Sequence, residues 1–259
     1  MKIHNVKQGS DEWVRLRIGT PTASCFDKIL RPSDGKLSAS SGKYMARLIA
    51  EWFTGMPLDD RTTAYMERGT ELEPDAAAWY AFDSGSTVEE VGFVTTDDER
   101  VGCSPDRFVD ANGGLEIKTP GIEQHVLYVL GRPEALYADH KCQVLGNLWL
   151  CKREWWEIVS FSPILPAVKW RVHRDDPDVV EFTKQMAEAV CAFADQLDAA
   201  KRKLAPLKAE REAALVKAME TADTGPFGGA THVRGGNEEE SGLPRRVSGQ
   251  GAERVERRQ

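Results

Sequence analysis

Apolar residues recur along this chain at spacings of three and four in some stretches and alternate with polar residues in others. The first spacing is typical of amphipathic helices, and the alternation is typical of half-buried strands. Polar capping residues stand ahead of several of the helical stretches, and Gly or Pro follows some of them. Helices are therefore expected at about 10–18, 22–26, 40–53, 69–82 and 135–150, and from Asp178 onward, with Pro206 as a candidate break.

The middle of the chain changes to short extended runs separated by turn residues. Four runs, at 88–94, 101–103, 107–109 and 115–118, are expected to form a curved antiparallel meander. Two further strands are expected at 155–161 and 168–172. Helices, then a mixed sheet, then more helices predict an α/β (α+β) fold, in which a central mixed sheet is flanked by helices.

Composition divides the chain into two parts. Its 259 residues are 41% hydrophobic, which is ordinary for a soluble globular protein. We expect one domain at 1–220 and a polar tail at 221–259, which is rich in Gly, Pro, Ser and charges and is expected to be disordered. No run approaches a membrane span and the N-terminus lacks a signal-peptide pattern, so we expect a cytoplasmic protein without membrane contact.

Cysteine spacing and net charge narrow the chemistry. The five cysteines include no CxxC pair, which argues against a zinc ribbon, a disulfide framework or an iron–sulfur cluster. A net charge of -7 is unusual for a protein that binds nucleic acid. It does not exclude such a partner, because an acidic enzyme can keep its positive charge inside a groove.

The strongest chemical signal is Asp106, followed by the run Glu116, Ile117 and Lys118. Strand alternation places Glu116 and Lys118 on one face and Ile117 in the core. Two carboxylates are ligands that Mg²⁺ or Mn²⁺ prefer, and an amine beside them can orient water and stabilise charge on a phosphate. The pattern predicts metal-assisted phosphodiester hydrolysis; solvated acids and a plain ion pair between Glu116 and Lys118 are the alternative interpretation.

Two further polar residues lie on predicted helices. Glu73 accompanies alanines and aromatic residues that would face the sheet, and Gln143 has Leu145, Leu148 and Trp149 around it. Periodicity alone is equally compatible with an ordinary surface position for each side chain.

Several motifs occur in an order that resembles the lambda-type phage exonucleases, which are viral recombinases of the PD-(D/E)XK nuclease superfamily. The resemblance covers about residues 5–200. The ordered set is specific, whereas the Asp and Glu-x-Lys core alone is not. Its segments are 8–13, 17–19, 22–24, 69–76, 102–106 and 114–120, together with Gln143.

The resemblance implies a restriction-endonuclease-like core and a Mg²⁺-dependent exonuclease, with two ions in each active site and Mn²⁺ able to substitute. Such an enzyme digests the 5′-ended strand of linear double-stranded DNA processively and leaves 3′ single strands. The resemblance also implies a ring-shaped homotrimer, a single-strand annealing protein as partner, and phage or prophage origin in a bacterial host.

The same resemblance assigns roles to individual residues. Asp106, Glu116 and the backbone carbonyl of Ile117 would bind metal, and Lys118 would assist the water. Glu73 and Gln143 would complete the catalytic centre. The residues expected to contact DNA are Arg17, Ser24 and Ser104 at the 5′-phosphate, Arg31 and Lys36 at the duplex, and Met66 as a wedge at the terminal base pair.

Some assignments keep alternatives. Arg17 can be a surface cation and Met66 an ordinary core methionine. Arg107 stands where the family has a small residue, and the tail has no family counterpart. An endonuclease or repair nuclease of the same superfamily, or a non-catalytic DNA-binding or annealing module, remain alternative functions. The segment Lys201-Arg202-Lys203 on the last predicted helix offers a docking surface.

Overall fold

The fold is known from a computed structural model, which describes residues 1–58 and 64–223, except for the side chains of 64–67, 70 and 220–223. The chain divides into two units, Met1–Glu210 and Arg211–Gln259. Both sheets and the cavities described below belong to the first unit. Residues 224–259 lie outside the described part, so the expected boundary at 220 and the expected disorder of 221–259 stay predictions.

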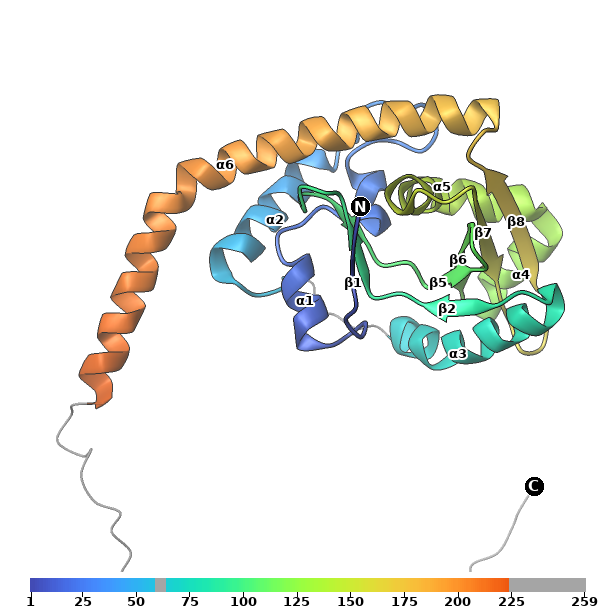
Figure 1. Ribbon diagram of the computed structural model, residues 1–259, viewed down its shortest axis with the longest axis horizontal. Helices are drawn as coiled ribbons and strands as arrows, with labels where there is room; N and C mark the ends of the chain where they lie inside the picture. The colour runs from blue at the N-terminus through green and yellow to red at the C-terminus, as the bar shows by residue number, and fades with distance from the viewer. Residues whose placement is uncertain (59–63, 224–259) are drawn as a thin grey trace, which may run out of the picture. The chain divides into compact units, whose positions relative to one another are not determined.

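Helices separate and follow the strands along the described part of the chain (Figure 1). The helices are α1 (Asp11–Arg17), the 3₁₀ helix η1 (Ala23–Lys28), α2 (Ser41–Thr54), α3 (Ala64–Ser84), α4 (Ile122–Gly131), α5 (Pro133–Cys151) and α6 (Pro177–Asp223). The strands are β1 (Lys2–His4), β2 (Val88–Glu90), β3 (Phe93–Thr95), β4 (Gly102–Cys103), β5 (Arg107–Val109), β6 (Gly113–Lys118), β7 (Trp155–Ser160) and β8 (Val168–His173).

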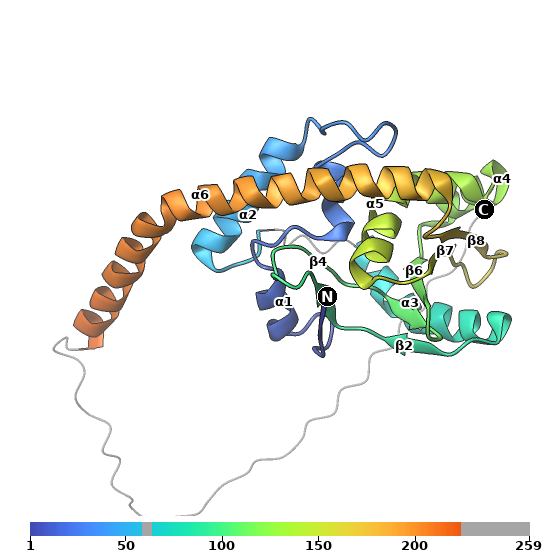
Figure 2. The same ribbon diagram turned by 45° about the horizontal axis from the view of Figure 1, so that its top comes forward.

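The central sheet has five strands in the order β2-β5-β6-β7-β8. Strands β6 and β7 are parallel, and the other neighbours are antiparallel. Helix α3 covers one face, where Leu115 and Ile117 of β6 pack with Ala76, Ala77 and Tyr80. Helix α5 and the first half of α6 cover the other face (Figures 1 and 2). This arrangement confirms the predicted α/β fold with a central mixed sheet between helices.

The expected antiparallel meander is wrong in one respect. The run at 88–94 is interrupted at Val91-Gly92, and its two halves belong to different sheets, because β3 pairs with β1 and β4 instead of extending β2. Gly92 lies against the backbone of His4 and Val6, where an added Cβ would come within 2.3 Å of the His4 carbonyl oxygen. Only glycine permits this approach, which brings β1 beside β3.

Three elements differ from the pattern-based expectation. Strand β1 was not expected, because it is too short to show an alternation. Helix α4 was not expected either, because its buried positions are His125 and Tyr128 while Leu127 and Leu130 are exposed, so its apolar residues do not mark the buried face. Helix α6 does not end at Pro206 and continues to Asp223. Within the described ranges, no helix is both long and apolar enough to cross a bilayer.

Close packing of η1 on α5 determines how these two elements meet. A Cβ added at Gly146 of α5 would lie 2.8 Å from the ring of Phe26 and 2.9 Å from Ala23, both in η1. The small residue lets the two helices approach, and Phe26 is fully buried as a result. Ser24 on η1 and Gln143 on α5 consequently line one common cavity.

Candidate active site

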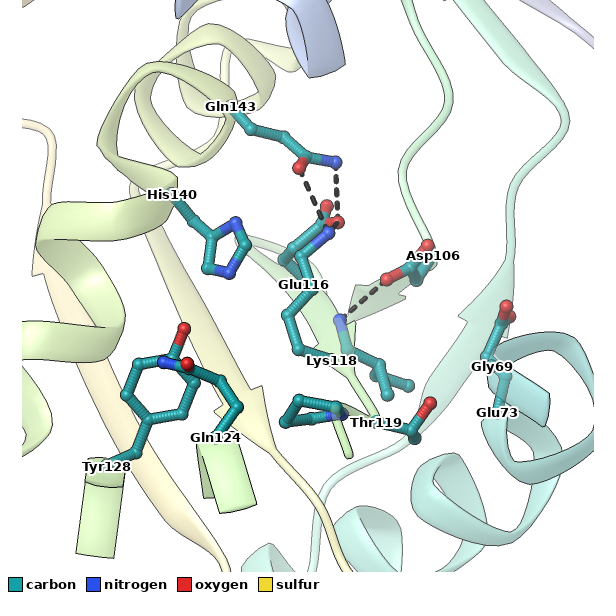
Figure 3. A pocket seen from close by; sticks show the side chains of 12 residues that line it. Gly69, Glu73, Asp106, Glu116, Lys118, Thr119, Gln124, Tyr128, His140 and Gln143 are labelled. Carbon is teal, nitrogen blue, oxygen red and sulfur yellow. Dashed lines mark hydrogen bonds and ion pairs between the residues drawn. The ribbon is translucent and has the colours of Figure 1, made fainter. Parts of the chain in front are cut away.

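An open cavity of about 600 Å³ lies at the end of β6, between α3, α4 and α5 (Figure 3). It contains all five residues predicted to be catalytic, together with Ile117. Its lining residues are Gly69, Glu73, Asp106, Glu116, Ile117, Lys118, Thr119, Pro120, Gln124, Tyr128, His140 and Gln143. The structure therefore brings these candidates together, and their catalytic roles stay predictions.

Glu116, Lys118 and Gln143 form a closed set of hydrogen bonds (Figure 3). The Lys118 ammonium donates to Glu116 Oε1 at 2.7 Å and to Gln143 Oε1 at 3.0 Å. The Gln143 amide in turn donates to Glu116 Oε1 at 2.5 Å. Glu116 and Lys118 are two residues apart on β6 and so lie on the same face of the sheet, where Gln143 of α5 can reach both of them.

Asn147 also holds Glu116, although the sequence pattern did not single it out. Its amide donates to Glu116 Oε2 at 2.9 Å, and only 1% of either residue is exposed. Asn147 follows Gln143 by four positions on α5, which places both amides on the same helix face. That spacing is the signal from which Asn147 could have been found.

Replacement of Asn147 by Ala should leave one oxygen of a buried carboxylate without its donor. Loss of a hydrogen-bond partner that orients a metal-binding side chain typically lowers metal affinity or activity by about 10- to 100-fold, so we expect kcat to fall in that range. The measurement is kcat together with thermal unfolding. Asn112→Ala, in the exposed turn before β6, is the matched control; equal kcat and melting temperature in both variants would contradict the role of Asn147.

Asp106 immediately precedes β5, and its Oδ2 atom accepts the backbone N–H of Ile117 at 2.6 Å. Burial raises the pKa of this carboxyl well above its ordinary value, and the negative charges of Glu116 and Glu73 add to the effect while Lys118 opposes it. For Lys118, burial lowers the pKa, but the carboxylates Glu116 and Asp106 outweigh burial and raise it. The lysine is therefore a cation at neutral pH.

The donor set fits a hard divalent cation. Among the residues that the structure describes, no group of three or more His, Cys, Asp or Glu side chains is placed to hold a metal ion. Two carboxylates are nevertheless sufficient for Mg²⁺, which is commonly bound by one or two carboxylates together with water and substrate phosphate. Asp106 and Glu116 supply that pair. Their negative charges repel each other, and a bound cation would neutralise these charges.

On the opposite wall of the cavity, Glu73 of α3 pairs with Arg107. The Arg107 guanidinium donates through Nη1 to Glu73 Oε1 at 2.7 Å and to the Asp106 backbone carbonyl at 2.5 Å. Glu73 therefore does not occupy an ordinary surface position, and the cation next to Asp106 has a specific partner. The pairing with Glu73 is not visible in the sequence, since 34 positions separate Arg107 from Glu73.

His140 lines the same cavity and was not predicted as a site residue. Burial, followed by the charge of Lys118, lowers the pKa of its imidazole to about 4, while Asp139 opposes the shift. It precedes Gln143 by three positions on α5, so helical spacing again provides the signal. A neutral imidazole at this position can accept or donate one hydrogen bond without adding charge to the cavity.

Arg17 and Ser104, two of the three predicted phosphate-binding residues, are in direct contact. Arg17 Nη1 donates to Ser104 Oγ at 2.8 Å, and the indole N–H of Trp13 donates to the same hydroxyl at 3.0 Å. The guanidinium lies 4.3 Å from the centre of the Trp13 ring. Burial lowers the pKa of Arg17, although an arginine side chain stays protonated in proteins. Arg17 is thus a partly buried cation and not a plain surface residue.

Ser24 lies on a neighbouring segment. Thr22 and Gly102 form a parallel bridge, so Ser24 and Ser104 each follow a bridged residue by two positions. Ser24 is exposed, shares a hydrogen bond of 3.2 Å with Thr22, and lines a second cavity of about 260 Å³. This second cavity shares His140 and Gln143 with the first one. Ser24 therefore lies beside the catalytic candidates, whereas Arg17 and Ser104 line neither of these two cavities.

The other predicted DNA contacts are less central. Arg31 bonds with Asp34 through both its Nε and its Nη2, and Lys36 is exposed on the same loop. The side chain of Met66 lies outside the described residues. On the predicted docking surface of α6, Lys201 donates to the Gly19 carbonyl at 2.8 Å and so serves the fold, whereas its neighbours Arg202 and Lys203 are exposed.

Comparisons with known proteins point to one family and one fold. Residues 12–154 match the family model described as the YqaJ-like viral recombinase domain. The alkaline exonuclease LHK-Exo from Laribacter hongkongensis is 31% identical, and the match covers 76% of this chain and 100% of that chain with a TM-score of 0.61. LHK-Exo has also been solved in complex with dAMP.

A second solved structure shows the same fold. It is a phage-related exonuclease from Haemophilus somnus 129PT, which is 18% identical. The match covers 70% of this chain and 95% of that one, with a TM-score of 0.52. No curated protein matches the chain.

Proposed function

The chain belongs to the YqaJ-like viral recombinase family, and from that premise we propose that it is a metal-dependent 5′→3′ exonuclease acting on linear double-stranded DNA. It would remove nucleotides from the 5′-ended strand and leave 3′ single strands for recombination by annealing. The observation that carries the proposal is the pair of the partly buried Asp106 and the buried Glu116 beside the Lys118 ammonium in one cavity. Its homology to exonucleases makes DNA the expected substrate.

Mg²⁺ is the proposed cofactor, with Mn²⁺ as a substitute and two ions in each site. Asp106, Glu116 and the backbone carbonyl of Ile117 would bind the metal. When bound, it would polarise the phosphoryl group and make water a better nucleophile at neutral pH.

The protein's own residues prepare the reaction. The Lys118 ammonium can orient the attacking water and balance the negative charge that develops on the phosphate. Gln143 fixes that ammonium by accepting its hydrogen bond at 3.0 Å, and it fixes Glu116 by donating at 2.5 Å. Hydrogen bonds within the protein thus hold both groups in place, so little reorganisation is needed at the moment of reaction.

End recognition is proposed to depend on Arg17 and Ser104. A guanidinium and a hydroxyl that already share a hydrogen bond of 2.8 Å can both turn their donors toward a phosphate. Ser104 stands two positions before Asp106, so one short segment joins the proposed phosphate pocket to the proposed metal site. Binding of a terminal 5′-phosphate would thereby place the adjacent phosphodiester in the cavity, which favours an exonuclease over an endonuclease.

Arg17→Ala should reduce the preference for 5′-phosphate over 5′-hydroxyl ends by about tenfold or more, because a hydrogen bond to a charged group contributes about 1.5–3 kcal/mol. The measurement is the ratio of kcat/KM on duplexes that differ only in that end. Arg15→Ala is the matched control, since Arg15 is an exposed arginine on the same helix. An unchanged ratio in Arg17→Ala would remove Arg17 from the pocket.

One digestion experiment tests the proposed function as a whole. End-labelled linear duplexes with 5′-phosphate or 5′-hydroxyl ends, together with a closed circle, are incubated with the protein and Mg²⁺. We expect nucleotides from the 5′-ended strand of the linear substrates and an intact circle. Nicking of the circle would indicate an endonuclease or repair nuclease, and strand annealing without nucleotide release would indicate a non-catalytic module.

The ring-shaped homotrimer and the annealing partner are part of the proposal and rest on the family relationship. Light scattering of the purified chain distinguishes a trimer from a monomer or dimer. Processivity on long duplexes should accompany the trimer, because a closed ring cannot leave its substrate sideways.

A further inference from the structure

Arg107 is a buried cation beside the candidate metal site. It begins β5, directly after Asp106, and only 7% of the residue is exposed. Its Nη1 donates both to Glu73 Oε1 and to the Asp106 backbone carbonyl, and its Nη2 lies 3.7 Å from Glu90 Oε1. One guanidinium therefore connects helix α3 to the residue that carries the first candidate metal ligand.

Glu73 is the main ionic partner of this arginine. The Glu73 side chain is 33% exposed, whereas the Glu90 side chain is 86% exposed and more distant, so solvent screens the second pair much more strongly. A buried guanidinium without an ionic partner would destabilise the folded protein, so the pair of Arg107 and Glu73 is expected to persist. Because Glu73 lines the cavity, the pairing also decides where its carboxylate stands.

Charges around the cavity show what the arginine changes. The carboxylates of Asp106, Glu116 and Glu73 line it, and Lys118 is the cation within it. Arg107 adds a second positive charge in direct contact with Glu73 and with the backbone of Asp106. Charges this close to a poorly solvated site alter its affinity for a divalent cation strongly.

We propose that Arg107 is a positioning residue that holds the Glu73 carboxylate against the cavity wall and lowers the affinity of the site for divalent cations. The inference rests on the proposed function in one respect, namely that the cavity binds such a cation. Arg107 thus keeps Glu73 in a fixed place and prevents its charge from adding fully to that of Asp106 and Glu116. The consequence is a weaker but better ordered metal site.

The test measures metal binding separately from DNA cleavage. Mn²⁺ is titrated into the full chain without DNA by calorimetry, and kcat and KM are measured with Mg²⁺ on a 5′-phosphorylated duplex. Arg107→Met should bind Mn²⁺ about tenfold more tightly, because a positive charge has been removed beside the site. Its kcat should nevertheless fall about tenfold, because Glu73 is no longer held.

Control and rescue variants separate charge from position. Arg107→Lys keeps the charge but lacks the rigid planar guanidinium, so it should hold Glu73 less firmly. Its Mn²⁺ affinity should stay within about twofold of the unchanged protein, and its kcat should be intermediate. Arg153→Met makes the same charge change at the far end of the β5–β6 hairpin, where Arg153 bonds to the carbonyls of Asp110 and Ala111. It should alter neither quantity.

A double-variant cycle completes the test. Glu73→Gln should weaken Mn²⁺ binding about tenfold, and Arg107→Met combined with Glu73→Gln should return it to within about threefold of the unchanged protein. If Arg107→Met binds Mn²⁺ more weakly or equally, or if Glu73→Gln leaves the affinity unchanged, the inference is wrong. Should Arg107→Met fail to fold, Arg107→Lys and Glu73→Gln decide the question by the same criteria.

Failure of the proposed function gives a different result. If the unchanged protein binds no Mn²⁺, the proposed metal site is wrong and this inference fails with it. If the unchanged protein binds Mn²⁺ and cleaves DNA but Arg107→Met does not bind more tightly, only the role of Arg107 is overturned.

Discussion

Asp106→Asn is expected to abolish Mg²⁺-dependent cleavage and at the same time to stabilise the metal-free protein. The amide can still accept the Ile117 N–H through its oxygen, so the local backbone bond of 2.6 Å can be kept. The substitution removes a partly buried carboxylate close to the negative charges of Glu116 and Glu73, and it removes a proposed metal ligand. Loss of metal-based charge stabilisation, worth several kcal/mol, corresponds to about a thousandfold decrease in kcat.

The two halves of this prediction are measured separately. Nucleotide release from a labelled duplex gives the activity, and thermal unfolding in EDTA and in Mg²⁺ gives the stability. In EDTA the variant should melt a few degrees higher, because no buried carboxylate has to be ionised. In Mg²⁺ the unchanged protein should gain stability and the variant should not.

Asp110→Asn is the matched control for this experiment. It makes the same chemical change at the other end of β5, and asparagine tolerates the positive φ of 46° found there. Its activity and its response to Mg²⁺ should stay unchanged. Full activity of Asp106→Asn would remove Asp106 from the catalytic site, and a lower melting temperature in EDTA would show that its carboxylate stabilises the fold.

Sequence patterns identified the parts of the fold whose signal is local. The alternation in β6 placed Glu116 and Lys118 on one face and Ile117 in the core, and the structure has Ile117 packed with residues of α3. The mixed central sheet also followed from the order of helical and extended segments. Periods of two and of three to four residues are properties of a strand or helix by itself, so one sequence is enough to detect them.

Contacts between distant segments could not be predicted in the same way. β1 pairs with β3 about ninety positions away, Arg107 meets Glu73 across 34 positions, and Asn147 meets Glu116 across 31. Each contact depends on how segments that are distant in the sequence come together in the fold, which no periodicity specifies. The family resemblance supplied Gln143 and Glu73 as candidates, but it could not supply Arg107, which departs from the family pattern, or the amide of Asn147.

Lys118→Met is expected to separate metal binding from catalysis. The methionine keeps most of the side-chain length but neither the charge nor the hydrogen bonds to Glu116 and Gln143. Loss of a donor that stabilises developing charge typically lowers kcat by about 10²- to 10³-fold. Affinity for Mn²⁺ should be kept or increased, because a positive charge next to the proposed ligands has been removed.

This outcome distinguishes Lys118 from Asp106, since Asp106→Asn should lose the metal together with the activity. Calorimetry with Mn²⁺ and single-turnover cleavage of a 5′-phosphorylated duplex measure the two quantities. Lys169→Met is the matched control, because Lys169 forms its ion pair with Asp83 at the outer strand β8. If Lys118→Met retains kcat, the ammonium does not act on the reacting groups and its bond to Glu116 is a plain ion pair. If instead it loses Mn²⁺ affinity along with kcat, Lys118 serves to hold Glu116 in place, and the water must be oriented by another group in the cavity.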